Sequence, residues 1–385
     1  MNGPAAVNGP AAVNEDAVTL TSYFGERQRT AGSAGAGGFA ADALLDLYGR
    51  REVATSILLR GAEGFGTRRH PRTDMSLTLS EDLPLIAVAV DTRSRIEPLI
   101  EPTARITGTG LVTLERARLL SSGSGSGDIE AVRLSEQVHE ETKLTVYLGR
   151  QERVYRVPAF VAVCDLLHHR GVAGATVLLG VDGTVHGRRE RAAFFSRNAG
   201  TPMMVIAVGS GDSVSRVLPE LGGLLRDPLL TLERVRICKR DGELFCPPSV
   251  LPAAAEGGMP LWHKLMVYTS EAALIEGQPI HRAIVRRLRA AGISGATTQR
   301  GVWGFHGDHA PHGDRLFQLG RRVPAVTVVI DSPERIATAF RVIDELTREQ
   351  GLVTSEAVPA IRPVTAAAAG QDPSRMSSSP DRAGL

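Results

Sequence analysis

The sequence predicts an α+β protein in which one structural unit is repeated three times. Similar segments, Leu-Val-Thr-Leu-Glu-Arg, Leu-Leu-Thr-Leu-Glu-Arg and the fainter Leu-Val-Thr-Ser-Glu, begin at Leu111, Leu229 and Leu352. A proline that opens an apolar run precedes these segments by 27, 27 and 28 residues, at Pro84, Pro202 and Pro324. Such regular spacing indicates a unit of roughly 100 residues, which is a small domain rather than a turn of a solenoid.

Composition and charge argue against several classes of protein. The 385 residues include 44 basic and 42 acidic ones, and the formal net charge of +2 argues against nucleic-acid binding. The three cysteines form no CxxC pair, so a reducing cytosol is the simplest interpretation. The first 16 residues lack the basic and apolar regions of a signal peptide, and no apolar run approaches the roughly 20 residues of a membrane span. We therefore expect a soluble, cytoplasmic protein that binds no nucleic acid.

Segments of low complexity divide the chain. Gly/Ser-rich and Ala/Pro-rich stretches have little to bury, and they are typical of linkers and disordered ends. The expected division is a disordered N-terminus at 1–15, unit one at 16–120, a Gly/Ser-rich linker at 121–140, unit two at 141–246, a linker at 247–261, unit three at 262–362 and a disordered tail at 363–385.

Each unit is expected to follow the order strand, helix, strand, strand, helix, strand. In copy two, Leu144, Val146 and Leu148 alternate along one face of the first strand, and Pro158 opens a helix that ends near Gly171. This order is the ferredoxin-like (βαββαβ) arrangement, with both helices on one face of a four-stranded antiparallel sheet. Because the other face must be covered, we expect three ferredoxin-like domains packed as an intramolecular pseudo-trimer by a monomeric chain.

The segments around the second strand carry a family resemblance. They read Leu-Arg-Gly-Ala-Glu-Gly-Phe-Gly from Leu59, Gly-Ala-Thr-Val-Leu-Leu-Gly from Gly174, and Gly-Ala-Thr-Thr-Gln-Arg-Gly-Val-Trp-Gly-Phe from Gly295. They resemble the domain of unknown function family 190, which belongs to the PII-like superfamily. The resemblance extends over all three copies. It implies a ferredoxin-like, PII-like fold and, for members with one copy, a trimer.

The resemblance also implies a non-enzymatic sensor or regulatory protein. Relatives in the PII superfamily bind small molecules, often adenine nucleotides, in clefts between subunits, and flexible loops report the bound state to a partner. ATP, ADP or another small anionic ligand is therefore expected. Genes of the family often lie beside fluoride-channel genes, which points to a membrane-protein partner. The Gly-Phe-Gly element becomes Gly183-Thr184-Val185 in copy two and Gly304-Phe305-His306 in copy three, so the clefts would differ.

Glycine and arginine gather after the second strand of each copy, where they could bind a phosphate group. Glycines permit close approach of the backbone, and guanidinium groups pair with phosphate oxygens. The alternative is a solvated loop whose glycines only make turns. The candidate ligand-binding residues are Arg60, Gly61, Gly64, Gly66, Arg68, Arg69, Gly180, Gly183, Arg188, Arg300, Gly301 and Gly304.

Copy three offers a different candidate site in the same region. His306, Asp308, His309 and His312 could bind zinc or another divalent metal through ring nitrogens and carboxylate oxygens. The alternative function is therefore a metal-binding module or a metal-dependent enzyme. The spacing matches no established closed site, however, and a solvated loop is favoured. A scaffold without any ligand is a further alternative.

No motif for catalysis stands out, and the sequence identifies no catalytic residue. It contains no Gly-x-Ser-x-Gly elbow, no complete Walker loop and no GxGxxG between a strand and a helix, so a sensor is favoured over an enzyme. Tyr23, Tyr147 and Tyr268 fall at one position of the first strand in each copy. They could stack on a base, but a half-buried strand also favours an aromatic residue, and the structural interpretation is preferred.

Overall fold

The structure is a computed structural model, and it describes most of the chain. The described residues are 13–30, 38–66, 72–73, 82–121, 141–185, 188–189, 201–249, 251, 254–255, 258–307, 311–313 and 323–362. Within these ranges, no helix is both long enough and apolar enough to cross a lipid bilayer.

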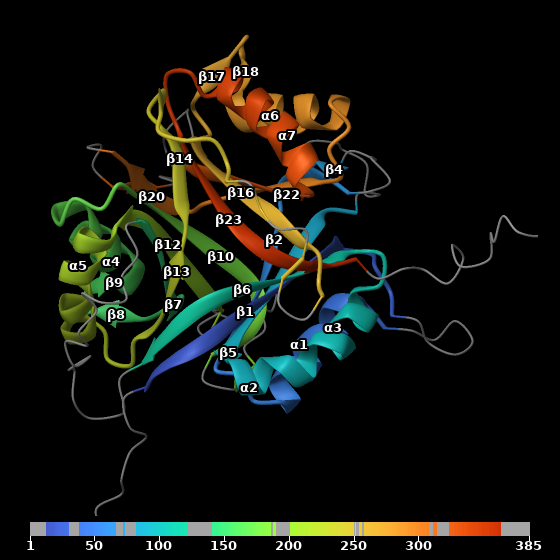
Figure 1. Ribbon diagram of the computed structural model, residues 1–385. Coiled ribbons are helices and arrows are strands. Elements are labelled where there is room, and N and C mark those ends of the chain that lie inside the picture. The colour runs from blue at the N-terminus through green and yellow to red at the C-terminus, as the bar shows by residue number, and fades with distance from the viewer. Residues whose placement is uncertain are drawn as a thin grey trace, which may run out of the picture.

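Four long strands occupy equivalent places in each copy (Figure 1). The strands of copy one are β1 (Val13–Gly25), β2 (Thr55–Arg60), β5 (Pro84–Thr92) and β6 (Leu111–Ser121). Those of copy two are β7 (Glu141–Gly149), β10 (Gly174–Val185), β12 (Pro202–Ser210) and β13 (Leu229–Arg234). Those of copy three are β16 (Leu261–Ser270), β19 (Ala296–Arg300), β22 (Pro324–Asp331) and β23 (Leu352–Ile361).

Helices connect these strands and lie on the outside of the molecule (Figure 1). They are α1 (Ala40–Arg50), α2 (Arg93–Ile96), the 3₁₀ turn η2 (Glu97–Leu99) and α3 (Ile100–Thr107) in copy one, α4 (Ala159–His169) and α5 (Gly211–Leu224) in copy two, and α6 (Ile280–Ala290) and α7 (Pro333–Leu346) in copy three. Pro158 and Pro279 stand directly before α4 and α6, where a proline costs the helix no hydrogen bond. Each helix buries its apolar side against the strands of its own copy, as Leu44, Leu45 and Tyr48 of α1 do.

Eight strands of copies one and two close into an antiparallel barrel. Around the barrel the order is β1, β5, β2, β10, β12, β7, β13, β6 and again β1, and each neighbouring pair is hydrogen-bonded in antiparallel register. The sheet crosses from copy one to copy two at two of these pairings, β2 with β10 and β13 with β6. The two copies therefore share one closed sheet.

Copy three joins the same sheet through short strands that pair with the other copies. Its β20 (Trp303–His306) pairs with β10 of copy two, and β14 (Arg236–Arg240) of copy two pairs with β23. From copy one, β3 (Glu63–Phe65) pairs with β19, while the end of β23 pairs with β6. The three copies thus exchange strand segments in cyclic order and form one sheet of 19 strands.

The predicted fold class, three ferredoxin-like α+β domains packed as a pseudo-trimer, is wrong. The closed eight-stranded barrel spans two copies, and the 19-stranded sheet includes all three, so the copies are not separate α+β domains. The PII-like architecture implied by the resemblance is not supported either. The physical reason is that strands run past their expected ends. β10 continues beyond Gly180 to Val185, and its second half pairs with β2 of another copy.

The apolar interior has separate and shared parts. One cluster lies between the helices and strands of each copy, and a fourth contains residues from all three copies. Val88, Ile206 and Val328, at corresponding places in β5, β12 and β22, belong to this shared cluster. Its residues face the inside of the sheet, and apolar burial of this kind is the main stabilising contribution to a fold. The candidate functional site lies within it.

Candidate functional site

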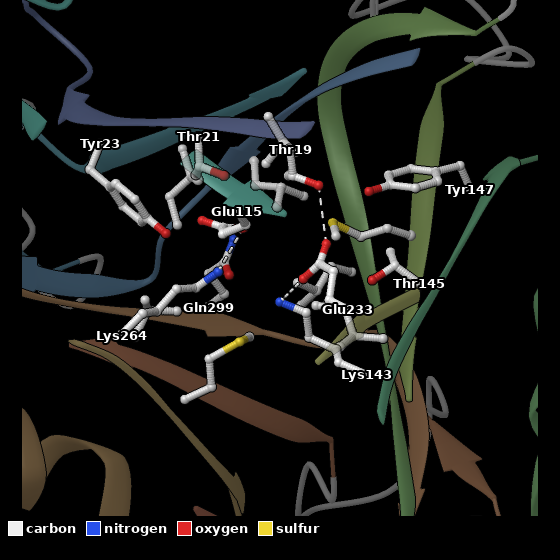
Figure 2. Close-up of a pocket in the computed structure, with 18 residues that line it drawn as sticks. Thr19, Thr21, Tyr23, Glu115, Lys143, Thr145, Tyr147, Glu233, Lys264 and Gln299 are labelled. Atoms are coloured by element: carbon white, nitrogen blue, oxygen red, sulfur yellow. Dashed lines mark hydrogen bonds and ion pairs between the residues drawn. The ribbon is translucent and has the colours of Figure 1, made fainter. Parts of the chain in front are cut away.

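Five charged side chains are buried where the three copies meet, and Figure 2 shows Glu115, Lys143, Glu233 and Lys264. Three glutamates occupy one position of the repeated segment, and two lysines occupy one position of the first strand. We call this set the central charge cluster: Glu115, Lys143, Glu233, Lys264 and Glu356. Their side chains are between 3% and 8% exposed. Such deep burial of charge requires pairing.

The strand register brings these residues together. Lys143 on β7 lies directly opposite Glu233 on β13, and Lys264 on β16 lies opposite Glu356 on β23. Residues opposite each other on antiparallel strands have neighbouring side chains. In copy one the residue opposite Glu115 is Thr19, so one copy lacks the lysine of the other two.

Ion pairs join the copies to one another within the cluster. Lys143 pairs with Glu233, and its Nζ also lies 3.1 Å from Glu356 Oε1 of copy three. Lys264 Nζ lies 3.1 Å from Glu356 Oε1 and 3.0 Å from Glu115 Oε2 of copy one. Glu356 therefore receives both ammonium groups, whereas Glu115 and Glu233 each receive one. One oxygen from each of the three carboxylates lies within 4.8 Å of the others.

Burial and pairing shift the pKa values of these groups. Burial disfavours the charged form of Lys143, but Glu233 and Glu356 outweigh it and raise the pKa of this lysine. For Glu356, burial is outweighed by Lys143 and Lys264, so its pKa is lowered. For Glu233, burial outweighs the attraction of Lys143 and raises its pKa. Three carboxyl groups face two ammonium groups, so full ionisation would leave one excess negative charge.

Neutral polar side chains border the cluster. Thr19 Oγ1 donates to Glu233 Oε1 at 3.1 Å, and Thr113 Oγ1 donates to Glu115 Oε1 at 2.9 Å. Gln299 lies beside Glu115 and Lys264 (Figure 2). It is 4% exposed, and its Nε2 has no hydrogen-bond partner among the residues that the structure describes.

The space enclosed by these groups is small. The cavity has a volume of about 50 Å³ and is lined by residues of all three copies. Since one water needs roughly 10–15 Å³, the cavity can hold a few waters or a small ion, but it cannot hold a nucleotide. Tyr23 and Tyr147 line it, and burial raises the pKa of both phenols. Tyr268 is buried in the same shared cluster. Packing of the rings in the buried interior therefore accounts for the position of the three tyrosines.

A second, larger cavity lies between copies two and three, and we call it the arginine pocket. Its volume is about 310 Å³, and it is lined by Glu141, Arg234, Val235, Arg236, Ser249, Ser355, Glu356 and Ala357. Both arginines are exposed. His263 holds one wall, because its ring nitrogens lie 2.7 Å from the Ser249 carbonyl oxygen and 3.1 Å from Ser355 Oγ. Glu356 reaches both this pocket and the central charge cluster.

Most of the predicted ligand-binding glycines lie at crossings between copies. A Cβ atom added at Gly64 would lie 2.5 Å from the Ala296 carbonyl oxygen. At Gly183 the corresponding distance is 2.3 Å to Ser56 O, and at Gly304 it is 2.2 Å to Ala175 O. Gly61, Gly180 and Gly301 lie three residues before these positions, each beside the proline of its own copy, whereas Gly66 has open space. Close approach of neighbouring backbones therefore requires glycine at these crossings.

The predicted cationic residues do not converge in the described structure. Arg60 pairs with Glu26 at 2.9 Å, and Arg300 pairs with Glu271 at 2.9 Å. Arg188 contributes its backbone to β11 (Arg188–Arg189). Arg68 and Arg69 lie outside the described residues. Phosphate binding by this set stays a prediction.

The predicted metal site is described only in part. His306 Nε2 lies 2.5 Å from Asp241 Oδ1 of copy two, and His312 lies in β21 (His312–Gly313). Asp308 and His309 lie outside the described residues. Metal binding by this loop therefore also stays a prediction.

Sequence reasoning missed the central charge cluster, although a signal was present. Each copy has a glutamate at the same position of its last strand, and two copies carry a lysine four residues before the first-strand tyrosine. A charge repeated at one place of every copy is brought to one point when the copies associate. The alternation of strand residues alone assigns the same charges to a solvated face.

The sequence is similar to a known protein family over all three copies. The DUF190 family model, described as "Uncharacterized ACR", matches residues 17–119, 141–237 and 262–360. A UPF0166 protein from Aquifex aeolicus is 33% identical over 98 residues, which are 25% of this chain and 90% of the relative. A UPF0166 protein from Methanocaldococcus jannaschii is 28% identical over 89 residues, which are 23% of this chain and 82% of the relative. Each of these relatives is thus about as long as one copy.

Proposed function

Since the chain belongs to the DUF190 family, with three copies of the family's unit, we propose that it is a non-enzymatic regulatory protein that binds a small anionic ligand. The proposed binding site is the arginine pocket between copies two and three. The observation that carries the proposal is the pair Arg234 and Arg236, which line this pocket and form no ion pair with any residue that the structure describes.

The strand geometry favours joint use of the two arginines. They are two positions apart along neighbouring strand segments, β13 and β14, and residues two apart in an extended chain lie on the same side. A guanidinium group presents paired N–H donors that match a carboxylate or a phosphate. Two of them on one wall therefore suit a ligand with a phosphate or carboxylate group.

The size and place of the pocket support a ligand of low molecular mass. About 310 Å³ is at the lower end of the roughly 300–1,000 Å³ of small-molecule sites. Arg236 belongs to β14, which pairs with β23 of copy three. A ligand bound there would contact the interface between copies two and three. Binding would therefore change the shape of a surface that a partner protein recognises. ATP and ADP are candidates, and inorganic phosphate is the smallest probe of the same chemistry.

Thermal-shift titration of the full chain with ATP, ADP, AMP and inorganic phosphate, with and without magnesium, tests the proposal. A ligand that binds only the folded state raises the melting temperature in a saturable way. We expect a saturable rise with at least one of these probes, and its loss in the double variant Arg234→Ala, Arg236→Ala. The matched control is Arg216→Ala, an exposed arginine on α5 away from the pocket, which should keep the response.

Two results would contradict the proposal. One is a flat response of the wild type to all probes. The other is a response that survives the double variant and is lost in Arg60→Ala, which would place the ligand at the end of β2 instead.

A further inference from the structure

The central charge cluster is a ring in which carboxylates and ammonium groups alternate, with one cation missing. Followed through its contacts, the order is Glu233, Lys143, Glu356, Lys264 and Glu115. Each lysine pairs with the glutamate opposite it in its own copy and with the glutamate of another copy. Glu115 and Glu233 are the ends of this series.

Thr19 occupies the place that would close the ring. It stands four residues before Tyr23, as Lys143 and Lys264 stand before Tyr147 and Tyr268. It lies opposite Glu115 of its own copy, and its hydroxyl donates to Glu233 of copy two. Thr19 therefore makes the contact with another copy that a lysine makes elsewhere, but through a neutral side chain.

Because copy one has threonine where the other two copies have lysine, three carboxylates face only two buried ammonium groups. An unpaired carboxylate in a site of low polarity is costly, so a further positive charge is favoured there. The raised pKa of Glu233 agrees with incomplete compensation at this end of the ring. A divalent ion would exceed the single missing charge and would be repelled by Lys143 and Lys264.

Gln299 is an independent sign of a ligand at this point. Its amide is buried to more than nine tenths and lines the cavity, and its Nε2 has no partner among the described residues. An amide can present either its oxygen or its NH₂ group to a neighbour. A buried amide that lacks a partner is rare in native proteins unless water or an ion completes the site.

We propose that one monovalent cation, ammonium or an alkali-metal ion, binds between Glu115 and Glu233 beside Thr19 and completes the ring. The oxygens of Glu115, Glu233 and Thr19, together with the carbonyl oxygen of the Gln299 amide turned toward the cavity, supply the polar contacts, and the cavity of about 50 Å³ accommodates an ion of this size. A proton on Glu233 would also balance the charge. Water would then fill the cavity and hydrogen-bond the Gln299 amide, and the dependence of stability on the cation at constant pH separates this arrangement from a bound ion.

Thermal unfolding in different chlorides at constant ionic strength tests the proposal. The protein is first dialysed at pH 8 into choline chloride, whose cation is too large for the cavity, and is then titrated with NH₄⁺, K⁺ or Na⁺. We expect a saturable rise in melting temperature with at least one small cation. No anion other than chloride is present, so the result is independent of ligand binding in the arginine pocket.

Two variants place the effect at the ring. Thr19→Lys provides the third ammonium group, and Glu233→Gln removes the excess carboxylate without adding volume. Both should abolish the response to small cations. If Thr19→Lys does not fold, Glu233→Gln decides the question alone.

Three outcomes would overturn the proposal. The wild type could show the same melting temperature in every chloride, or the folded variants could respond as the wild type does. In the third, stability would not depend on the cation, and Glu233→Gln would remove a gain in stability that the wild type shows as the pH falls. That result would assign the missing charge to a proton.

Discussion

Lys143 of copy two lies 3.1 Å from Glu356 of copy three, between Nζ and Oε1, while it also pairs with Glu233 on the neighbouring strand of its own copy. Both partners in the contact between copies are less than one tenth exposed. A single side chain thus connects two copies of the repeat through buried charge, and Lys264 does the same for copies three and one. Loss of either lysine should affect the whole molecule.

Replacement of Lys143 by methionine should lower the free energy of unfolding by about 3–5 kcal/mol, the usual cost of removing one partner of a buried ion pair. Methionine keeps much of the side-chain volume but leaves the carboxylates of Glu233 and Glu356 with less compensation. Urea unfolding at pH 7 measures the change. Arg170→Ala, which breaks an exposed pair with Glu220, should have little effect, because solvent screens such pairs. Equal losses in the two variants would refute the importance of the buried ring.

The glycines at the crossings between copies should be needed for stability rather than only for ligand binding. Gly183→Ala places a Cβ atom 2.3 Å from the Ser56 carbonyl oxygen and should destabilise the protein by about 1–3 kcal/mol through local displacement. Gly66→Ala is the matched control, because no atom lies within 4 Å of its added Cβ. Chemical denaturation of both variants tests this, and a Gly183→Ala protein as stable as the wild type would contradict the described crossing.

His263 should make the protein less stable in mild acid. Burial lowers its pKa from the ordinary value of 6.5, against a smaller opposing effect of the Ser249 carbonyl. The unfolded chain therefore binds more protons near pH 6.5, so stability is fully present above that pH and is lost as the pH falls through the lower, folded pKa. His263→Gln, which does not titrate, should lose less stability between pH 7.5 and pH 5.5.

The comparison must be made between two proteins that both retain Glu233. Its raised pKa acts in the opposite direction, since protonation adds stability as the pH falls. Urea midpoints at the two pH values measure the difference. Identical shifts in the wild type and His263→Gln would show that His263 does not contribute.

The chain should be monomeric in solution. Strand segments of each copy pair with another copy of the same chain, so the sheet edges that separate copies would offer to other molecules are already used. Sedimentation equilibrium should give the mass of one chain, 41.0 kDa. A stable dimer or trimer over a wide range of concentrations would contradict this expectation.

The sequence predicts much of the local structure and little of the pairing between copies. Regular spacing locates the repeats, and proline before α4 and α6 marks where these helices begin. Alternation of apolar residues identifies strands such as β7, but it does not say which strand lies beside them. Strand β10 continues past Gly180 and pairs with another copy. The alternation of apolar residues does not predict this pairing.

The candidate site was less accessible to sequence reasoning for a related reason. Glu115, Glu233 and Glu356 are far apart in the chain, and each alone has the pattern of a polar residue on the exposed side of a strand. Their meeting depends on the closure of the sheet. The repeat itself was the usable signal, because equivalent residues of associated copies face a common centre.

Differential scanning calorimetry of the full chain tests most directly whether the three copies form one structure around one charged centre. We predict a single transition whose calorimetric and van't Hoff enthalpies agree, and which Lys143→Met moves as a whole to lower temperature. Two or three separable transitions, only one of which responds to Lys143→Met, would show that the copies fold as independent domains and would contradict this account.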